Sequence, residues 1–437
     1  MNRKPMLIII LTIFLLGLLG AVSKIQKVEA SETIYIMADG SVVPSSAPIK
    51  REGNVYTFTQ DIVNNSIVVK RENVEIDGAE HKLQGTGIYT EGSGLYLNNV
   101  TRVTIKKVKI SEFYWGVQMF LCSDCALLES EMSNNGYGIY PNWCNNSLIA
   151  RNKVVNNEGG GIYLTNSFNF SVEDNTVTSN RFYGIRLTNS HNCTLIENVI
   201  TNNSGDGIHL VLSNNNVVYH NNFVDNTRQA RTEDEVTDNA WDDGYPSGGN
   251  YWSDYTGSDI DYDGIADSWY EIDIDSIDNY PLMGMFSSFN TSYGYAVNFV
   301  SNSSISNFSF NLNNTEIYTP EAILTFNVTG ETGTEGFLRV CIPKILINGS
   351  YVVKFDGEVI TNTTYPQVKE LPCSNGTYAY FYINYTHSEH TVEISGTTTI
   401  SEFPSFLILP LFIIATLLIV IIVSLLILII YKKKRKT

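Results

Sequence analysis

The chain is poor in soft metal ligands and, away from its ends, in positive charge. Its 437 residues include six cysteines and six histidines, and 17 % are charged. Nine of the 28 Lys and Arg residues lie in residues 1–30 and 432–437, which leaves a central part with 19 basic and 44 acidic residues. Nucleic-acid binding depends on clustered Lys and Arg, so this acidic body excludes it. Divalent cations and neutral sugars remain compatible partners.

Long hydrophobic runs are missing except at the two ends. Residues 1–30 have a basic start, an apolar run and a closing Ala30, which is typical of a secretory signal peptide. Residues 406–431 carry no charge and are followed by a basic tail at 432–437. A helix of this length crosses the hydrocarbon core, and basic flanks stay inside. The sequence therefore predicts a single-pass protein of the cell membrane with its N-terminal domain extracellular.

If the chain is exported, its asparagines can be glycosylated and its cysteines can form disulfides. Fifteen Asn-x-Ser/Thr sequons lie between the apolar ends, which is compatible with a glycoprotein. Cys341 and Cys373 stand together in the last part expected to fold, so an oxidising exterior would let them form a disulfide.

A repeat of 22 to 23 residues occupies the middle of the chain. Its glycines are Gly94, Gly116, Gly138, Gly161, Gly184 and Gly207. The positions one, three, eleven and sixteen places after each glycine are apolar, as in Leu95, Leu97, Ile105 and Ile110. The one-and-three alternation is strand periodicity, and strands joined by Asn and Gly turns bury these columns only by coiling. A leucine-rich repeat needs a Leu-x-x-Leu-x-Leu frame, which is absent, so the sequence predicts an all-β parallel β-helix.

Asparagines recur at the same period. Two columns are expected to form amide ladders between coils: Asn134, Asn157, Asn180, Asn203 and Asn226, and Asn152, Asn175, Asn198 and Asn221. A third column is Asp124, Asn146, Asn169, Asn192 and Asn215. Because Asn tolerates the left-handed backbone of sharp turns, we expect these columns to be structural.

The segments around this repeat resemble a known family. IYIMADGSVVPSSAPIKREGNVYTFTQDI, NVEIDGAEHKLQGTGIY and the coils are similar to the right-handed β-helix of NosD-type proteins, named for a periplasmic copper-binding factor. NAWDDGYPSGGNYWSDYTG and DNYPLM resemble the closing segment of archaeal surface members. GFLRVCIPK, YFYINYTHSEHTVEI and SEFPSFLILPLF resemble the small β-sandwich and membrane anchor attached to such proteins. The resemblance implies a fold and an exterior location, but a fold alone does not determine function.

Copper handling, which the family name suggests, is a remote alternative. A copper site needs clustered His, Met or Cys, whereas the six histidines are scattered. His387 and His390 are three residues apart on an expected strand, so we expect them to face opposite sides.

One acidic loop predicts a structural calcium site. Asp259, Asp261, Asp263 and Asp267 occupy positions 1, 3, 5 and 9 of the loop, and Gly264 allows the turn at position 6. Hard oxygen ligands at this spacing wrap Ca²⁺. Tyr270 replaces the glutamate that an EF-hand needs at position 12, so the loop is closer to the calcium loops of extracellular repeats. A solvated acidic turn is the alternative.

The outer wall of the coils offers a candidate ligand-binding surface. The residues two places after each glycine point outward: Tyr96, Gln118, Tyr140, Tyr163, Arg186 and His209. Aromatic rings at the coil spacing would stack on sugar rings, which makes Tyr140, Tyr163, Arg186 and His209 candidate polysaccharide contacts. The alternative is that Tyr simply favours half-exposed strands.

Two other groups are the candidate catalytic residues if the protein is an enzyme. Thirteen places after the glycines run Lys107, Glu129, Arg151, Asp174, Glu197 and His220. Most of this column alternates in charge, as a surface ion-pair ladder does, but Asp174 and Glu197 are like charges one coil apart. Repulsion between them would raise one pKa and provide an acid and a base. Asp206 and His209 gather with Tyr163 and Arg186 in the manner that a lyase requires.

These observations predict an order of domains. The expected parts are a signal peptide (1–30), a β-helix with an N-terminal cap (31–228), a closing segment with the calcium loop (229–285), a β-sandwich (286–398), a linker (399–405), a transmembrane helix (406–431) and a basic tail (432–437). The predicted function is binding of extracellular polysaccharide or building of the envelope, and the alternative is a polysaccharide lyase, hydrolase or epimerase. The coil register also places Cys122 beside Cys144 at disulfide distance, and Cys125 three coils from Cys193.

Overall fold

The computed structural model describes residues 33–89, 91–233, 238–313 and 321–398. The described chain divides into two compact units. The first runs to Ile260 and includes Ile265–Leu282, and the second contains Asp261–Gly264 and the residues from Met283 onward. The predicted signal peptide, transmembrane helix and basic tail lie outside the described residues. Among the described residues, no helix has the length and apolar character needed to cross a membrane.

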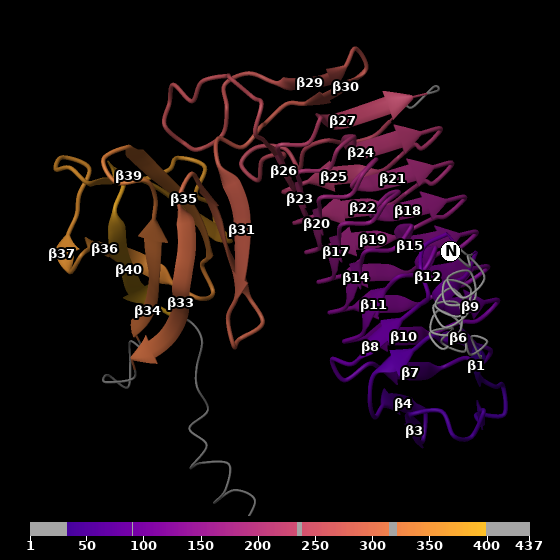
Figure 1. Cartoon of the computed structure of the whole chain (residues 1–437). Coiled ribbons are helices and arrows are strands. Elements are labelled where there is room, and N and C mark those ends of the chain that lie inside the picture. Colours follow the sequence, from indigo (N-terminus) through magenta and orange to yellow (C-terminus); the bar gives the residue numbers. More distant parts are fainter. Residues whose placement is uncertain (1–32, 90, 234–237, 314–320, 399–437) are drawn as a thin grey trace, which may run out of the picture. The chain divides into compact units, whose positions relative to one another are not determined.

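The first unit is a right-handed parallel β-helix of about eight turns (Figure 1). Sheet A has ten strands: β1 (Thr33–Ile36), β2 (Val42–Val43), β6 (Ser66–Val69), β9 (Ser93–Asn98), β12 (Trp115–Phe120), β15 (Tyr137–Asn142), β18 (Ile162–Thr165), β21 (Ile185–Thr188), β24 (Asp206–Val211) and β27 (Arg228–Glu233). Sheet B has nine: β3 (Ile49–Glu52), β4 (Val55–Phe58), β7 (Val74–Asp77), β10 (Val103–Lys106), β13 (Ala126–Leu128), β16 (Leu148–Ala150), β19 (Ser171–Glu173), β22 (Thr194–Ile196) and β25 (Val217–Tyr219). Sheet C has nine: β5 (Ile62–Val63), β8 (Lys82–Gln84), β11 (Lys109–Ser111), β14 (Glu131–Ser133), β17 (Lys153–Val155), β20 (Thr176–Thr178), β23 (Val199–Thr201), β26 (Asn222–Val224) and β28 (Tyr251–Trp252).

The apolar columns line the interior as predicted. In sheet A, Val117 pairs with Leu95 and with Ile139, and each of these side chains is 0 % exposed. The column eleven places after the glycines lies in sheet B, and the column sixteen places after lies in sheet C. Each coil therefore contributes one strand to each sheet, and its core residues pack on those of its neighbours.

The asparagine ladders form, with one correction. The main-chain and side-chain N–H groups of Asn152 both donate to Oδ1 of Asn175, at 2.9 and 3.0 Å. In the other ladder the N–H group of Asn135, not that of Asn134, donates to Oδ1 of Asn157. Asn134 is exposed with a φ of 55°, because the coil that begins at Gly116 is one residue shorter than those after it. The third column has the left-handed backbone expected of turns: Asp124, Asn146, Asn169, Asn192 and Asn215.

The closing segment of the first unit contains a buried carboxylate, that of Asp278. Asn250 continues the ladder by accepting from both N–H groups of Asn221. Oδ2 of Asp278 accepts from the main-chain N–H group of Asn250 and from the indole of Trp252, and Oδ1 accepts from Tyr280. A short hairpin of β29 (Tyr270–Asp273) and β30 (Ser276–Asp278) carries this carboxylate.

The second unit is built from two antiparallel sheets. Sheet D, in the order β31-β32-β35-β39-β38, contains β31 (Met285–Asn290), β32 (Ala296–Ser301), β35 (Glu335–Pro343), β38 (Gln367–Glu370) and β39 (Tyr378–Thr386). Sheet E, in the order β33-β34-β40-β36-β37, contains β33 (Ser304–Asn313), β34 (Glu321–Thr329), β36 (Asn348–Phe355), β37 (Glu358–Val359) and β40 (Glu389–Thr397). Alternate residues such as Phe326, Leu338 and Ile383 are fully buried in one core to which both sheets contribute.

Candidate functional site

The outward stripe of sheet A is half-buried rather than protruding. Tyr163 pairs with Arg186, and Arg186 pairs with His209, which places the predicted contacts on successive coils. Tyr140, Tyr163 and Arg186 are partly exposed, whereas His209 is buried. Burial raises the pKa of Tyr140.

The ring of Tyr140 in the stripe belongs to a stack with rings one place before the repeat glycines. The ring of Trp115 lies 4.1 Å from that of Tyr140 and 4.6 Å from that of Tyr137, with interplanar angles of 15° and 26°. Such stacking covers ring faces, so these side chains present mainly edges and hydroxyl groups to solvent. The free aromatic platform expected from the sequence is therefore largely used in packing between coils.

The surface of sheet A has a groove at the C-terminal end of the row of stacked rings. Tyr163 is tilted by 43° from Tyr140, and the guanidinium of Arg186 lies 5.3 Å from the ring centre of Tyr163 and 5.5 Å from that of Tyr183. The groove has a volume of about 550 Å³. It is lined by Tyr137, Tyr163, Phe182, Tyr183, Arg186, Gly205, Asp206 and Arg231. We call this the sheet A groove.

Two lining residues that were not singled out from the sequence, Tyr137 and Tyr183, share a signal. Tyr137 and Tyr183, like the already noted Asp206, stand one place before a repeat glycine, a second outward column of sheet A. In this column Gly160 makes room for Tyr183, because a Cβ there would lie 1.9 Å from the ring. Arg231 lies on β27, beyond the last repeat glycine, and pairs with His209.

Charged groups gather at the same end of the groove. Nδ1 of His209 lies 3.6 Å from Oδ2 of Asp206, and Nε2 lies 3.2 Å from Oε2 of Glu233. Nε of Arg228 lies 3.8 Å from Asp206, and Arg231 lies between Asp206 and Glu233. Burial, followed by the charge of Arg186, lowers the pKa of His209 to about 4, so the ring is neutral near pH 7. The sequence-predicted set Tyr163, Arg186, Asp206 and His209 is thus brought together.

The other catalytic candidates lie on a turn between sheets B and C. Asp174 and Glu197 both have the left-handed backbone of that turn. Burial raises the pKa of both carboxyl groups, and for Glu197 the charge of Asp174 adds to the effect. Earlier in this column the expected ion-pair ladder is present, since Glu129 lies 4.0 Å from Lys107 and 3.5 Å from Arg151.

The cysteines occupy the columns predicted for them, as free thiols. The main-chain N–H group of Cys122 donates to Sγ of Cys144 at 3.4 Å, and Cys144 donates likewise to Ser167. The two thiols therefore fill a ladder position that serine takes in later coils. Cys341 and Cys373 pack against one small cluster in the second unit. Both disulfides stay predictions.

The acidic loop brings three of its four carboxylates together. Asp259, Asp261 and Asp263 each offer an oxygen within 4.8 Å of the others, a donor set that suits Ca²⁺. Asp267 instead accepts a hydrogen bond from the main chain of Ile260. Asp263 also lies 3.5 Å from the guanidinium of Arg339, which competes with a cation for this carboxylate. In the described parts of the chain, this is the group of three His, Cys, Asp or Glu side chains close enough to share an ion.

Comparison with known proteins relates the first unit to one family. Residues 52–257 match the family model described as periplasmic copper-binding protein (NosD). The β-helix is NosD-like. The match spans somewhat less than half of the chain, and no curated protein sequence matches. Among the described residues, the side chains close enough to share an ion are the aspartates of the acidic loop, whose oxygens suit hard cations.

Several solved structures are similar to part of the chain. The periplasmic alginate epimerase AlgG is 16 % identical, with a TM-score of 0.33 over 54 % of this chain and 75 % of that one. Dettilon tailspike protein (gp208) is 12 % identical, with a TM-score of 0.29 over 78 % and 86 %. DFA-IIIase from Arthrobacter chlorophenolicus A6, in complex with GF2, is 11 % identical, with a TM-score of 0.30 over 44 % and 62 %. At these values the similarities carry no argument about function.

Proposed function

We propose that the β-helix binds an extracellular polysaccharide in the sheet A groove. The observation that carries the proposal is the convergence of Tyr137, Tyr163 and Tyr183 with Arg186 and Arg231 on one concave surface. Pockets of this size, with ring surfaces and a few fixed polar groups, are typical ligand sites. Because successive coils lie about 4.8 Å apart, a polymer lying along the axis would meet equivalent strands at regular steps.

The charges favour acidic sugar units. Arg228 and Arg231 lie against the carboxylates of Asp206 and Glu233, and Arg186 lies over the rings of Tyr163 and Tyr183. Three guanidinium groups and two carboxylates give the groove a local positive excess on an acidic protein. Guanidinium groups bind carboxylates in a fixed, often bidentate geometry. A chain of uronate residues therefore matches this surface better than a neutral one.

Retention on immobilised polysaccharide tests the proposal. We expect Arg186→Gln together with Arg231→Gln to lower affinity for a polyuronate at least tenfold, whereas Arg151→Gln, on the turn of the ion-pair ladder, leaves it unchanged. Retention of a polyuronate that does not depend on the groove arginines would contradict the proposal. No retention of any polysaccharide would favour the envelope-structural alternative.

A second candidate function is catalysis on the bound polymer. Neutral His209 beside Asp206 is a candidate proton acceptor, and Arg186 would neutralise a substrate carboxylate. His209→Gln should then abolish the formation of unsaturated or reducing ends while binding persists. Loss of turnover in Asp174→Asn or Glu197→Gln alone would instead point to the turn between sheets B and C.

We also propose that Asp259, Asp261 and Asp263 hold a structural Ca²⁺. Their convergence supports the proposal, because three carboxylates without a cation repel one another. Asp267 would shape the loop through its bond to Ile260. In the absence of calcium, Arg339 is the group that offsets the charge of Asp263.

We propose from the sequence that the protein is anchored in the cell membrane. The uncharged residues 406–431 and the basic residues after them support a single-pass membrane anchor with the β-helix outside. Protease treatment of intact cells should remove the β-helix and leave a short membrane-bound fragment. Protection of the whole chain would contradict this orientation.

A further inference from the structure

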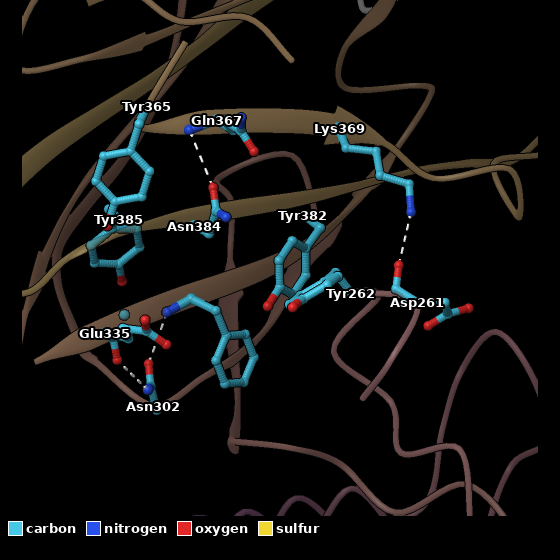
Figure 2. A pocket seen from close by; sticks show the side chains of 12 residues that line it. Asp261, Tyr262, Asn302, Glu335, Tyr365, Gln367, Lys369, Tyr382, Asn384 and Tyr385 are labelled. Carbon is cyan, nitrogen blue, oxygen red and sulfur yellow. Dashed lines mark hydrogen bonds between the residues drawn. The ribbon is translucent and has the colours of Figure 1, made fainter. Parts of the chain in front are cut away.

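The second unit has a pocket of its own on the outer surface of sheet D. The pocket has a volume of about 660 Å³, and its lining residues all belong to the second unit. Its floor is a row of three side chains on adjacent strands: Phe337 of β35 pairs with Asn384 of β39, which pairs with Gln367 of β38. Figure 2 shows the lining side chains, and we call this cavity the sandwich pocket.

Aromatic rings stand on two sides of the sandwich pocket. Phe337 stacks on Tyr382 with ring centres 5.7 Å apart and an angle of 11°, and Tyr262 lies 6.3 Å from Tyr382. Tyr365 stands on the far side from Tyr262 (Figure 2). Tyr262 is 60 % exposed and Tyr365 is 57 % exposed. Two large rings held open to water around one cavity indicate a binding surface rather than core packing.

The floor between the rings carries amide groups. Oδ1 of Asn384 accepts from the main-chain N–H group of Gln367 at 3.3 Å, which fixes the orientation of the amide. The side-chain amide of Gln367 is exposed beside it. The Nζ group of Lys369 donates to the carbonyl of Asp261 at 3.0 Å and so holds the loop that carries Tyr262. The pocket thus has aromatic rings at its sides, side-chain amides at its floor and a loop at its rim that Lys369 holds in place.

The charges at the rim restrict the class of ligand. Asp261 and Glu335 line the pocket together with one cation, Lys369. Even with Asp261 committed to the proposed calcium ion, Glu335 and Lys369 leave no excess of positive charge among these side chains. This balance disfavours phosphates, sulfates and uronates. A purely apolar ligand would offer no hydrogen bond to the side-chain amide of Gln367 or to the Nδ2 group of Asn384, which is costly on desolvation.

We infer that the sandwich pocket binds one or two units of a neutral saccharide. Ring faces would take the C–H surfaces of the sugar, and the amides of Asn384 and Gln367 would exchange hydrogen bonds with its hydroxyl groups. This site differs in chemistry from the arginine-bearing sheet A groove and does not depend on it. The two units would therefore recognise different sugars.

A glycan array probed with the full-length chain tests this inference. The probes are neutral gluco-, manno- and galacto-oligosaccharides and, in parallel, uronate oligosaccharides. We expect Tyr365→Ala together with Gln367→Ala to lower retention of a neutral oligosaccharide at least tenfold and to leave uronate binding unchanged. Tyr262→Ala, on a separate segment, should have the same effect. Tyr378→Ala is the matched control, since it is an exposed tyrosine of β39 outside the pocket.

The outcomes separate this inference from the function proposed for the sheet A groove. Failure of the wild-type chain to retain any neutral oligosaccharide would overturn it, as would retention that survives both pocket variants. If Arg186→Gln loses only uronate binding, the inference about the sandwich pocket is unaffected. The thermal midpoints of the pocket variants should match that of the wild type, because the substituted side chains are exposed.

Discussion

At the residue scale, the carboxyl of Asp278 is unusual because it is fully buried. Burial raises its pKa to about 7 from 3.8, even though three N–H groups donate to it and oppose the shift. A carboxyl group with a raised pKa binds its proton more tightly in the folded chain. Its stabilising contribution is therefore complete below pH 3.8 and is lost as the pH rises through about 7.

The first prediction follows from this pH dependence. The thermal midpoint of the β-helix should fall from pH 4 to pH 7 more in the wild type than in Asp278→Asn, which cannot titrate. The variant should be less stable throughout, because a single amide oxygen replaces two acceptors. Asp273→Asn is the control, because Asp273 lies in the same hairpin and accepts from the main-chain N–H group of Asp275. Parallel midpoint curves for the wild type and Asp278→Asn would contradict the assignment.

A second prediction concerns the thiols of Cys122 and Cys144. Because the N–H group of one donates to the sulfur of the other on the adjacent coil, oxidation should join them in a disulfide. Peptide mapping under non-reducing conditions should recover this pair, and should recover Cys341 with Cys373. Recovery of Cys125 joined to Cys193 would be incompatible with the register, since those residues are three coils apart.

At the scale of the coil, the asparagine ladders provide hydrogen bonds to the turns. The apolar columns cannot provide these bonds. Asn175 accepts from both N–H groups of Asn152 and donates to the carbonyl of Ile149 at 2.8 Å. Removing the side chain leaves buried donors of the preceding coil without partners. Each such group costs about 1–3 kcal/mol.

The third prediction is that Asn175→Ala lowers the thermal midpoint by roughly 5 to 10 °C. Asn169→Gly is the matched control, because Asn169 is exposed and glycine keeps the positive φ of its turn. This control should change the midpoint by about 2 °C at most. Equal losses in the two variants, measured by circular dichroism, would show that the amide ladder contributes no more than an exposed turn.

Much of the coil could be predicted because its period is nearly constant, at 22 or 23 residues. Counting from each glycine placed Leu95, Ile105 and Ile110 in the correct sheets. Counting in fixed steps of 23 gave Asn134 in place of Asn135, because one coil is shorter. The sheet A groove could not be predicted, since a period gives the direction of Tyr163 but not the tilt of its ring or the space above Gly160.

At the scale of the whole molecule, the acidic loop contributes to both compact units. Ile265 bridges to Leu282 within the first unit, and Asp263 pairs with Arg339 within the second. A bound ion that favours the folded loop would stabilise it by about 2.7 kcal/mol at a free concentration one hundred times the dissociation constant.

The fourth prediction is that chelation of calcium makes residues 241–281 the first site of proteolysis, while the coils from Gly94 to Asn226 survive. Asp261→Ala together with Asp263→Ala should give the same cleavage pattern in the presence of calcium. Calorimetry at millimolar Ca²⁺ provides the direct measurement. No heat of binding, together with cleavage that chelator does not alter, would reduce the loop to an acidic turn.

The asparagine ladder that ends at Asn250 has a direction. The groups at its end determine whether another chain can add to the end of the β-helix. Every amide donates toward the next coil, so a further coil would have to offer an acceptor to the last donor. The carboxylate of Asp278 already fills that place at Asn250, and Trp252 is held over the same end. An open stack of strands templates the addition of another chain. We therefore expect the buried aspartate to block end-to-end fibre growth. Loss of this carboxylate should then let copies of the protein polymerise, which sedimentation of Asp278→Ala would detect.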